Sequence, residues 1–208
     1  MPRTKMDRFE QRKATRAKLV EAALQLFSTS GYEHATVDDI SQAAGYSKGA
    51  YYFHFSTKDD ILLELLRMWT EDRNTQLAGA AESARNREGL RDVLAGFFSY
   101  AMSPRWPGVL LEFWAQAIRN QEVSKRLTEA YAAWRKHLAE AFEGARDAGV
   151  ITAPAEDAAA VALAAHDGYA VQVAIGAPGA KAMTAVDLAE SLLLPLETAA
   201  IERRAAAQ

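Results

Sequence analysis

The stretch that most constrains this chain runs from Thr36 to Lys58 and reads TVDDISQAAGYSKGAYYFHFSTK. Thr36 is placed to cap a short helix, because its hydroxyl can accept from the amides of the first turn and two aspartates follow it. That helix ends at Gly45, and Ser47 begins another, so that only Gly45 and Tyr46 connect the two. The pattern therefore predicts a helix-turn-helix.

A tight corner between two helices can have a purely structural role. The side chains exposed on the second helix therefore have to distinguish a structural corner from a binding surface. The inward positions are apolar, and they are Ile40, Ala44, Ala50 and Phe55. This arrangement leaves Lys48, Tyr52 and His54 at or near the outer surface. Such side chains suit phosphate contacts, and Lys48 is long enough to reach guanine acceptors in a major groove.

The charge distribution agrees with a nucleic-acid partner at one end of the chain. Overall net charge is −3, but residues 1–58 hold nine Lys/Arg against six Asp/Glu, which gives +3. The other 150 residues hold fifteen against twenty-one, which gives −6. A polyanion would be attracted to the N-terminal part and repelled by the rest.

Composition predicts a helical protein and excludes several chemistries. Half of the 208 residues are hydrophobic, and only six prolines and twelve glycines interrupt the chain. The absence of cysteine excludes disulfides, metal–thiolate sites and a cysteine nucleophile. The N-terminal residues are charged, and the apolar runs are shorter than the roughly 18 residues of a membrane span. We expect a soluble, cytoplasmic protein without a membrane partner.

The segment TVDDISQAAGYSKGAYYFHFSTKDDIL resembles the tetracycline-repressor (TetR) family of bacterial transcription regulators. The matching positions are Thr36, Ile40, Ala43, Ala44, Gly45, Ser47, Lys48, Gly49, Tyr52, His54, Phe55 and Lys58. The resemblance implies an all-α fold, with a three-helix DNA-binding domain in residues 1–57 and an effector-binding and dimerisation domain in residues 58–208. It also implies phosphate contacts by Thr36, Tyr52, His54 and Lys58, and places Ser47, Lys48 and Gly49 against the DNA groove.

Two tyrosines depart from the family pattern. Tyr46 and Tyr51 stand where small or aliphatic residues are common. Packing in the core is the preferred interpretation, and a direct contact that alters the operator sequence is the alternative. Tyr51 is accordingly kept among the candidate DNA-binding residues.

Apolar periodicity predicts further helices on both sides of the motif. A long helix begins at Thr57 with Leu62, Leu65, Leu66 and Trp69 as its stripe, and it should link the two domains. The other expected helices are residues 12–30, 89–102, 107–119, 122–148, 155–176 and 182–203.

Bulky rings recur along the helices of the second domain. Rings at helical spacing are more often core than ligand contacts, but together they suit the lining of a small-molecule cavity. The candidate pocket residues are Trp69, Phe97, Tyr100, Glu112, Phe113, Trp114, Gln116, Tyr131, Trp134, His137, His166 and Tyr169. Such a lining suits a mid-sized apolar or aromatic effector.

The last two helices are rich in small and apolar residues. They could close a monomer core, or they could build the four-helix dimer interface that the resemblance implies. We expect the dimer, with an interface made of Ala165, Gly168, Gln172, Ala189, Leu192, Leu193 and Leu196.

Three functions remain open on the sequence. The preferred one is a homodimeric repressor that binds a palindromic operator and is released by a small-molecule effector, without catalysis, metal or cofactor. The second is a DNA-binding regulator controlled by a protein partner. The third is an enzyme that combines His137 or His166 with Glu112 or Asp167, but no catalytic motif or spacing supports it.

Overall fold

Helices make up the fold of the residues that the structure, a computed structural model, describes: 5–103, 106–180 and 182–206. The helices run in the order α1 (Lys5–Ser30), α2 (Val37–Ala43), α3 (Lys48–His54), α4 (Lys58–Leu77), α5 (Ala80–Ser83), α6 (Arg87–Ser99), α7 (Pro107–Ala117), α8 (Gln121–Asp147), α9 (Ala155–Ala174) and α10 (Ala185–Ala206). The described part contains no strand, so the expected all-α fold is confirmed.

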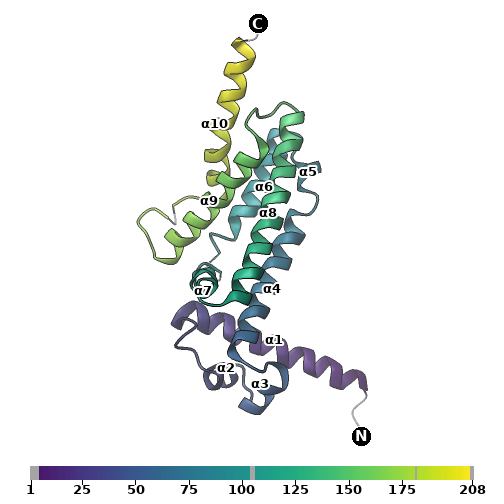
Figure 1. Cartoon of the computed structure of the whole chain (residues 1–208), viewed down its shortest axis with the longest axis vertical. Helices are drawn as coiled ribbons and strands as arrows, with labels where there is room; N and C mark the ends of the chain where they lie inside the picture. Colours follow the sequence, from purple (N-terminus) through teal and green to yellow (C-terminus); the bar gives the residue numbers. More distant parts are fainter. Residues whose placement is uncertain (1–4, 104–105, 181, 207–208) are drawn as a thin grey trace.

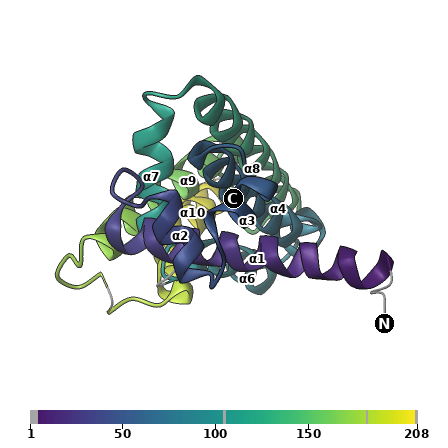
Figure 2. The same cartoon turned by 90° about the horizontal axis from the view of Figure 1, so that it is seen from below.

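Helices α1, α2 and α3 pack together at one end of an elongated molecule, and α10 projects at the other end (Figure 1). We call α1–α3 the head. Its core is formed by apolar side chains that are almost fully buried, namely Leu19, Ala23, Phe27, Ile40 and Phe55. Seen from below, α1 extends sideways past the rest of the head toward the N-terminus (Figure 2).

Helix α4 leaves the head and runs into the body made by the remaining helices (Figure 1). Thr57 caps it through a capping box with Asp60, whereas the sequence alone is compatible with either Ser56 or Thr57 as the cap. The predicted stripe faces inward, because Leu62, Leu65 and Trp69 are at most 1% exposed. Helix α4 packs on α1 at the head and on α6 and α8 in the body, so it is continuous with both.

The rest of the body differs from the predicted helices mainly at its turns. A short helix, α5, packs on α8, and sequence periodicity did not predict it because it is only four residues long. Asn86 caps α6, which begins two residues earlier than expected. Pro195 lies inside α10 without ending it.

Helices α9 and α10 complete the body in different ways. Helix α9 packs on α8, whereas α10 packs on α6, where Arg87 and Glu190 form an ion pair. Among the described helices, none combines the length and the apolar character that a bilayer crossing requires.

Candidate nucleic-acid interface and internal polar cluster

Local capping rules build the corner between α2 and α3. The Thr36 hydroxyl accepts from the Asp39 amide at 3.1 Å, and the Asp39 carboxylate accepts from the Thr36 amide at 2.9 Å. Gly45 then turns the chain with a φ of 76°, which favours glycine. Ser47 caps α3 by accepting from the Ala50 amide at 3.3 Å. The predicted helix-turn-helix is therefore present, with the predicted caps.

The outer face of α3 exposes polar and aromatic side chains. Tyr52 is 50% exposed and Phe53 is 63% exposed. Lys48 forms an exposed ion pair with Asp38, with 3.0 Å between Nζ and Oδ2. Exposed pairs of this kind contribute little stability, so Lys48 is free to exchange its carboxylate partner for a phosphate or a base edge.

Cations of α1 extend this face, which sequence reasoning noted only as a basic N-terminus. The Arg12 guanidinium lies 4.9 Å from the Phe53 ring centroid, and Lys18 Nζ lies 5.8 Å from that of Tyr46. A surface groove of about 340 Å³ follows this junction of α1 and α3, and its lining includes Arg12, Phe53 and His54. Partial burial, together with Arg16 and Arg12, lowers the pKa of His54. The exposed α3 face and the basic α1 side chains thus adjoin each other.

Two of the predicted DNA-binding residues, Tyr51 and Lys58, are engaged within the head, as is Tyr46, for which a DNA contact was the alternative to packing. Tyr51 is 0% exposed and its hydroxyl donates to the Thr57 carbonyl at 2.9 Å, so it packs in the core and a direct DNA contact is ruled out by burial. Tyr46 is half-buried beneath Lys18. The Lys58 ammonium donates to the carbonyls of Tyr32 at 2.7 Å and Ala35 at 3.1 Å.

The Lys58 contacts join the first turn of α4 to the loop between α1 and α2. Lys58 Nζ also lies 4.2 Å from the centroid of the Tyr32 ring. A phosphate contact by Lys58 would require the ammonium to give up or share these carbonyls. Thr36, Tyr52 and Gly49 are exposed and have no such restriction, apart from the capping bonds of Thr36.

In the body, rings from four helices form what we call the ring cluster. Its members are Trp69, Phe97, Tyr100, Phe113, Tyr131 and Trp134. The centroid separations are 4.6 Å between Trp69 and Trp134, 5.7 Å between Trp69 and Phe113, and 5.3 Å between Tyr131 and Trp134. The structure thus brings together half of the twelve predicted pocket residues.

The ring cluster surrounds an arginine that sequence reasoning missed. Arg73 is 0% exposed, and its guanidinium carbon lies 4.3 Å from the Phe97 centroid, 4.7 Å from Tyr100 and 5.4 Å from Trp134. Burial lowers the pKa of Arg73 to about 9, although Asp167 acts in the opposite direction. The signal was in the sequence, because Arg73 continues the apolar stripe of α4 four residues after Trp69.

A chain of hydrogen bonds adjoins the ring cluster. Trp114 Nε1 donates to the Tyr131 hydroxyl at 3.0 Å, and this hydroxyl donates to Asp167 Oδ2 at 2.6 Å. His166 Nδ1 lies 3.0 Å from Asp167 Oδ1, so the carboxylate selects the tautomer with the proton on Nδ1. His166 contacts Phe97 at 4.8 Å between centroids, and burial lowers the pKa of His166 to about 4. Its imidazole is therefore neutral at pH 7.

Four predicted pocket residues make their contacts elsewhere, which corrects their assignment. Gln116 donates to Glu33 at 3.1 Å, at the junction between α7 and the head. Glu112 lies against Gly31 at the end of α1. His137 faces Glu140 on its own helix at 3.5 Å, and the Tyr169 hydroxyl donates to the Ala180 carbonyl. Helical spacing alone did not distinguish the inner face from these other faces.

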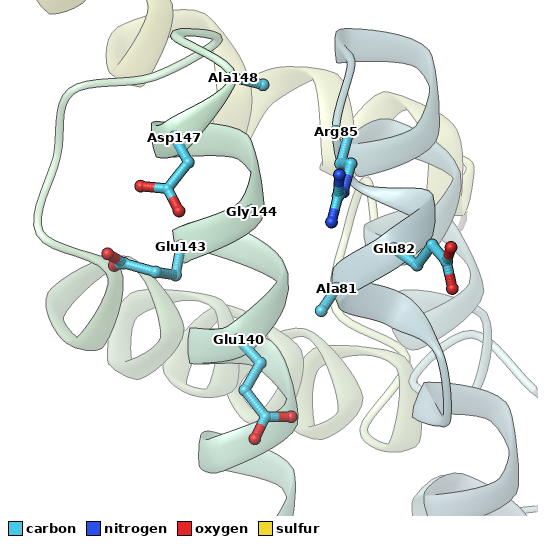
Figure 3. A pocket seen from close by; sticks show the side chains of 8 residues that line it. All are labelled: Ala81, Glu82, Arg85, Glu140, Glu143, Gly144, Asp147 and Ala148. Carbon is cyan, nitrogen blue, oxygen red and sulfur yellow. The ribbon is translucent and has the colours of Figure 1, made fainter.

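A groove of about 690 Å³ between α5 and α8 is a poorer ligand site. Figure 3 shows that its walls carry Glu140, Glu143 and Asp147 on α8 and Glu82 and Arg85 on the opposite side. Ala81, Gly144 and Ala148 complete the lining, so no aromatic ring contributes. A Cβ on Gly144 would lie 2.7 Å from the Ala81 carbonyl oxygen, which shows how closely α5 and α8 approach. Open walls of this kind, with charged side chains and without aromatic rings, lack the enclosure in which most small-molecule sites bury a ligand.

The predicted interface residues fall into two groups. Ala189 and Leu193 are 0% exposed within a single chain, so they belong to its own core, which corrects their assignment. Gly168 and Gln172 are exposed on α9, and Leu192, Leu196 and Ala165 are half-buried. The exposed side of α9 also carries Val161 at 54% and Ile175 at 68% exposure, while Leu194 on α10 is 63% exposed.

Similar proteins are named as transcription regulators. A stretch of 63 residues, 30% of this chain, is 48% identical to the uncharacterized HTH-type transcriptional regulator YwcC of Bacillus subtilis and covers 28% of it. The HTH-type transcriptional repressor AcnR of Corynebacterium glutamicum is 30% identical over 132 residues, covering 64% of this chain and 62% of the relative. The chain thus spans less than two thirds of the length of either relative.

Solved structures share the fold over most of the chain. The regulator FadR of Bacillus subtilis, described in complex with stearoyl-CoA, superimposes with a TM-score of 0.69 at 21% identity, covering 88% of this chain and 97% of that one. Residues 19–65 match the model of bacterial regulatory proteins of the tetR family, and residues 86–196 match that of the C-terminal part of BetI-type transcriptional repressors. These two matches include most of the head, the first eight residues of α4, helices α6 to α9 and the first half of α10, and the chain belongs to the TetR family of bacterial regulatory proteins.

Proposed function

We propose that the chain is a homodimeric transcriptional repressor of the cytoplasm that binds a palindromic DNA operator and is released from it by a small molecule. Residues 1–57 would bind DNA, residues 58–208 would bind the effector and the second subunit, and no catalysis would be involved. The observation that carries the proposal is the exposed face of α3, with Lys48 and Tyr52, beside the basic side chains of α1.

The DNA contacts follow from this face. Lys48 begins α3, so this end of the helix would enter the major groove with Ser47 and Gly49 beside it. Tyr52, Thr36 and His54 would donate to phosphates on either side. Lys58 would hold the loop before α2 in place, with its phosphate contact as the alternative.

The dimer would form through the exposed side of α9 together with α10. Val161, Gly168, Gln172 and Ile175 lie at helical spacing, and the small residues allow close approach of a second helix. Two heads joined in this way would meet successive half-sites of a palindrome about one helical turn of DNA apart.

Helix α4 would couple the two domains. Lys58 at its start contacts the head, and Arg73 near its end lies in the ring cluster, about 22 Å away along a straight helix. A ligand that moves the Arg73 end would change the position of the head and lower operator affinity. The Bacillus subtilis FadR complex supports a small-molecule effector for a protein of this fold.

The DNA-binding proposal is tested by selecting a duplex from a random library with the purified chain and measuring its affinity by fluorescence anisotropy. Lys48→Ala should weaken binding by about 10-fold or more, and affinity should fall steeply with salt. Lys136→Ala, an exposed lysine of α8, serves as the control. Failure to select any sequence, or equal affinities for the two variants, would refute the proposal.

Lys58→Ala separates the two roles of that residue. Loss of a phosphate contact should reduce the slope of log affinity against log salt by about one, whereas loss of a loop contact should weaken binding with the slope unchanged. We expect the second outcome because of the carbonyl contacts of the ammonium.

The dimer is tested by sedimentation. Ile175→Glu should produce a monomer that binds the palindrome far more weakly, because a charge would be buried in the interface. Ala132→Glu, at an exposed position on α8, should remain dimeric. A dimer that survives the Ile175 substitution would exclude this interface.

A further inference from the structure

The ring cluster and the arginine that it surrounds contain more hydrogen-bond donors than acceptors for them. None of the three nitrogens of Arg73 has a hydrogen-bond acceptor in the described part of the chain, and the same holds for Trp134 Nε1. A guanidinium carries five N–H groups, and the indole adds one. The Arg73 guanidinium carbon lies 5.4 Å from the Trp134 ring centroid, so these donors belong to neighbouring side chains.

The neighbouring carboxylates are occupied by other donors. Asp167 accepts from Tyr131 on one oxygen and from His166 on the other. Asp72 accepts from the Tyr100 hydroxyl. The salt bridges of the described residues include none to Arg73, so its charge has carboxylates in its surroundings but none in contact.

Burial of such a group is unfavourable unless something compensates it. An uncompensated buried charge destabilises the fold strongly, and buried donors without acceptors add to this. The faces of Trp69, Phe97, Tyr100 and Trp134 offset part of the cost through cation–π attraction, but rings accept no conventional hydrogen bonds. What would complete the site is an anion with an apolar body.

We propose that Arg73 recognises the carboxylate of a monoanionic aromatic acid, with Trp134 Nε1 as a second donor and the rings of the cluster against the aromatic body. This assignment names the effector class of the site proposed above and rests on that proposed function. A guanidinium binds a carboxylate through two parallel N–H···O bonds. A single cation with Asp167 nearby favours a charge of −1 over the −2 of a phosphate.

His166 supplies a complementary acceptor. Its Nδ1 faces Asp167, and its Nε2 is buried without a donor in the described residues. Arg73 and His166 both contact the Phe97 ring. A ligand hydroxyl or N–H beside Phe97 would therefore be bound by Nε2.

Entry of the acid has to move helices. Arg73 on α4 is fully buried under Phe97 of α6 and Trp134 of α8, so the anion reaches it only when these helices separate. Binding energy is then available for the displacement of α4.

The test measures ligand binding to the full chain in the absence of DNA, by calorimetry and thermal shift. The probes are benzoate, 2-naphthoate and indole-3-acetate, each paired with its primary amide. At least one carboxylate should bind and raise Tm, with its amide at least 10-fold weaker. Arg73→Met should weaken carboxylate binding at least 10-fold and leave amide binding unchanged, whereas Arg126→Met, an exposed arginine of α8, should bind as the parent does.

Trp134→Phe keeps an aromatic ring of smaller size and removes the indole donor, so it tests the site even if Arg73→Met does not fold. It should weaken the carboxylate several-fold without affecting the amide. Absence of binding by all three carboxylates, equal affinity of an acid and its amide, or unchanged acid binding by a folded Arg73→Met protein would overturn the assignment.

A second measurement separates this assignment from the proposed function. If a neutral or cationic compound releases the selected duplex while no carboxylate binds, the proposed repressor function is supported and the recognition of an aromatic acid by Arg73 is wrong. If a carboxylate binds through Arg73 but leaves DNA affinity unchanged, Arg73 recognises an aromatic acid as proposed, and the proposed release of DNA by this ligand is wrong.

Discussion

The head and the body of this protein treat polar groups in opposite ways. In the head, polar side chains such as those of the Thr36–Asp39 capping box lie at the surface and are paired by neighbours a few residues away. In the body, Arg73 and His166 are buried and keep nitrogens that have no partner among the described residues. The first arrangement suits the large charged partner proposed for the head, and the second suits the small ligand proposed for the body.

The largest test of this contrast is truncation of one ring in each region. Trp69→Ala should lower the free energy of unfolding by about 3–5 kcal/mol, because Trp69 is buried between Phe113 and Trp134. Tyr52→Ala on α3 should change it by less than about 0.5 kcal/mol. Urea unfolding measures both, and similar losses would erase the distinction between the two regions.

A pH series examines the buried imidazole. His166 in the folded state has a pKa of about 4, below the ordinary value of 6.5, so between these values the unfolded chain binds a proton that the folded chain does not. Stability should therefore fall as the pH drops from 6.5 to 4, by at most about 1.4 kcal/mol per pH unit from this group.

The matched variants isolate that contribution. His166→Gln should flatten the pH dependence of the unfolding free energy, whereas His137→Gln, at a partly exposed position, should keep it. If the unfolding free energy depends on pH equally in the parent and in His166→Gln, groups other than His166 control the loss of stability at low pH.

Removal of the unpaired charge should stabilise the body. Arg73→Met keeps an unbranched apolar stem and eliminates a buried guanidinium, so the free energy of unfolding should rise by about 1–3 kcal/mol. Arg67→Met on the same helix should instead be neutral or slightly destabilising, because Arg67 is paired with Glu64 and Glu71. If Arg73→Met is destabilised instead, the cation–π contacts with the surrounding rings already compensate the burial of the guanidinium.

The smallest effect is expected at a cap that joins the two regions. Thr57→Ala removes the acceptor for the Asp60 amide and should lower the free energy of unfolding by about 1 kcal/mol. Thr57→Ser should retain most of that stability, because the hydroxyl remains. Equal losses in the two variants would point to the methyl group rather than the cap.

The head could be predicted from the sequence in more detail than the body, because its polar contacts are local and those of the body join different helices. Thr36, Gly45 and Ser47 act on residues at most four positions away, so their roles follow from spacing alone. Trp134 contacts Trp69 and Arg73 on α4, which are distant in the sequence, and periodicity cannot say which side chains of two helices will meet.

Burial of a charge was the feature hardest to predict. Arg73 is on the apolar stripe of α4, where a long side chain ordinarily extends to solvent, and only the packing of α6 and α8 closes that route. Tyr51 differs in this respect, because core packing was the preferred interpretation of the sequence, and the structure buries its ring and pairs its hydroxyl with the Thr57 carbonyl.

His54 gives the head a further property. Burial, with Arg16 and Arg12, keeps its pKa low in the free chain. A phosphate placed against this imidazole would counter those cations and favour the charged form. The DNA binding proposed above would then take up a proton, and the chain would bind DNA more tightly as the medium becomes more acidic.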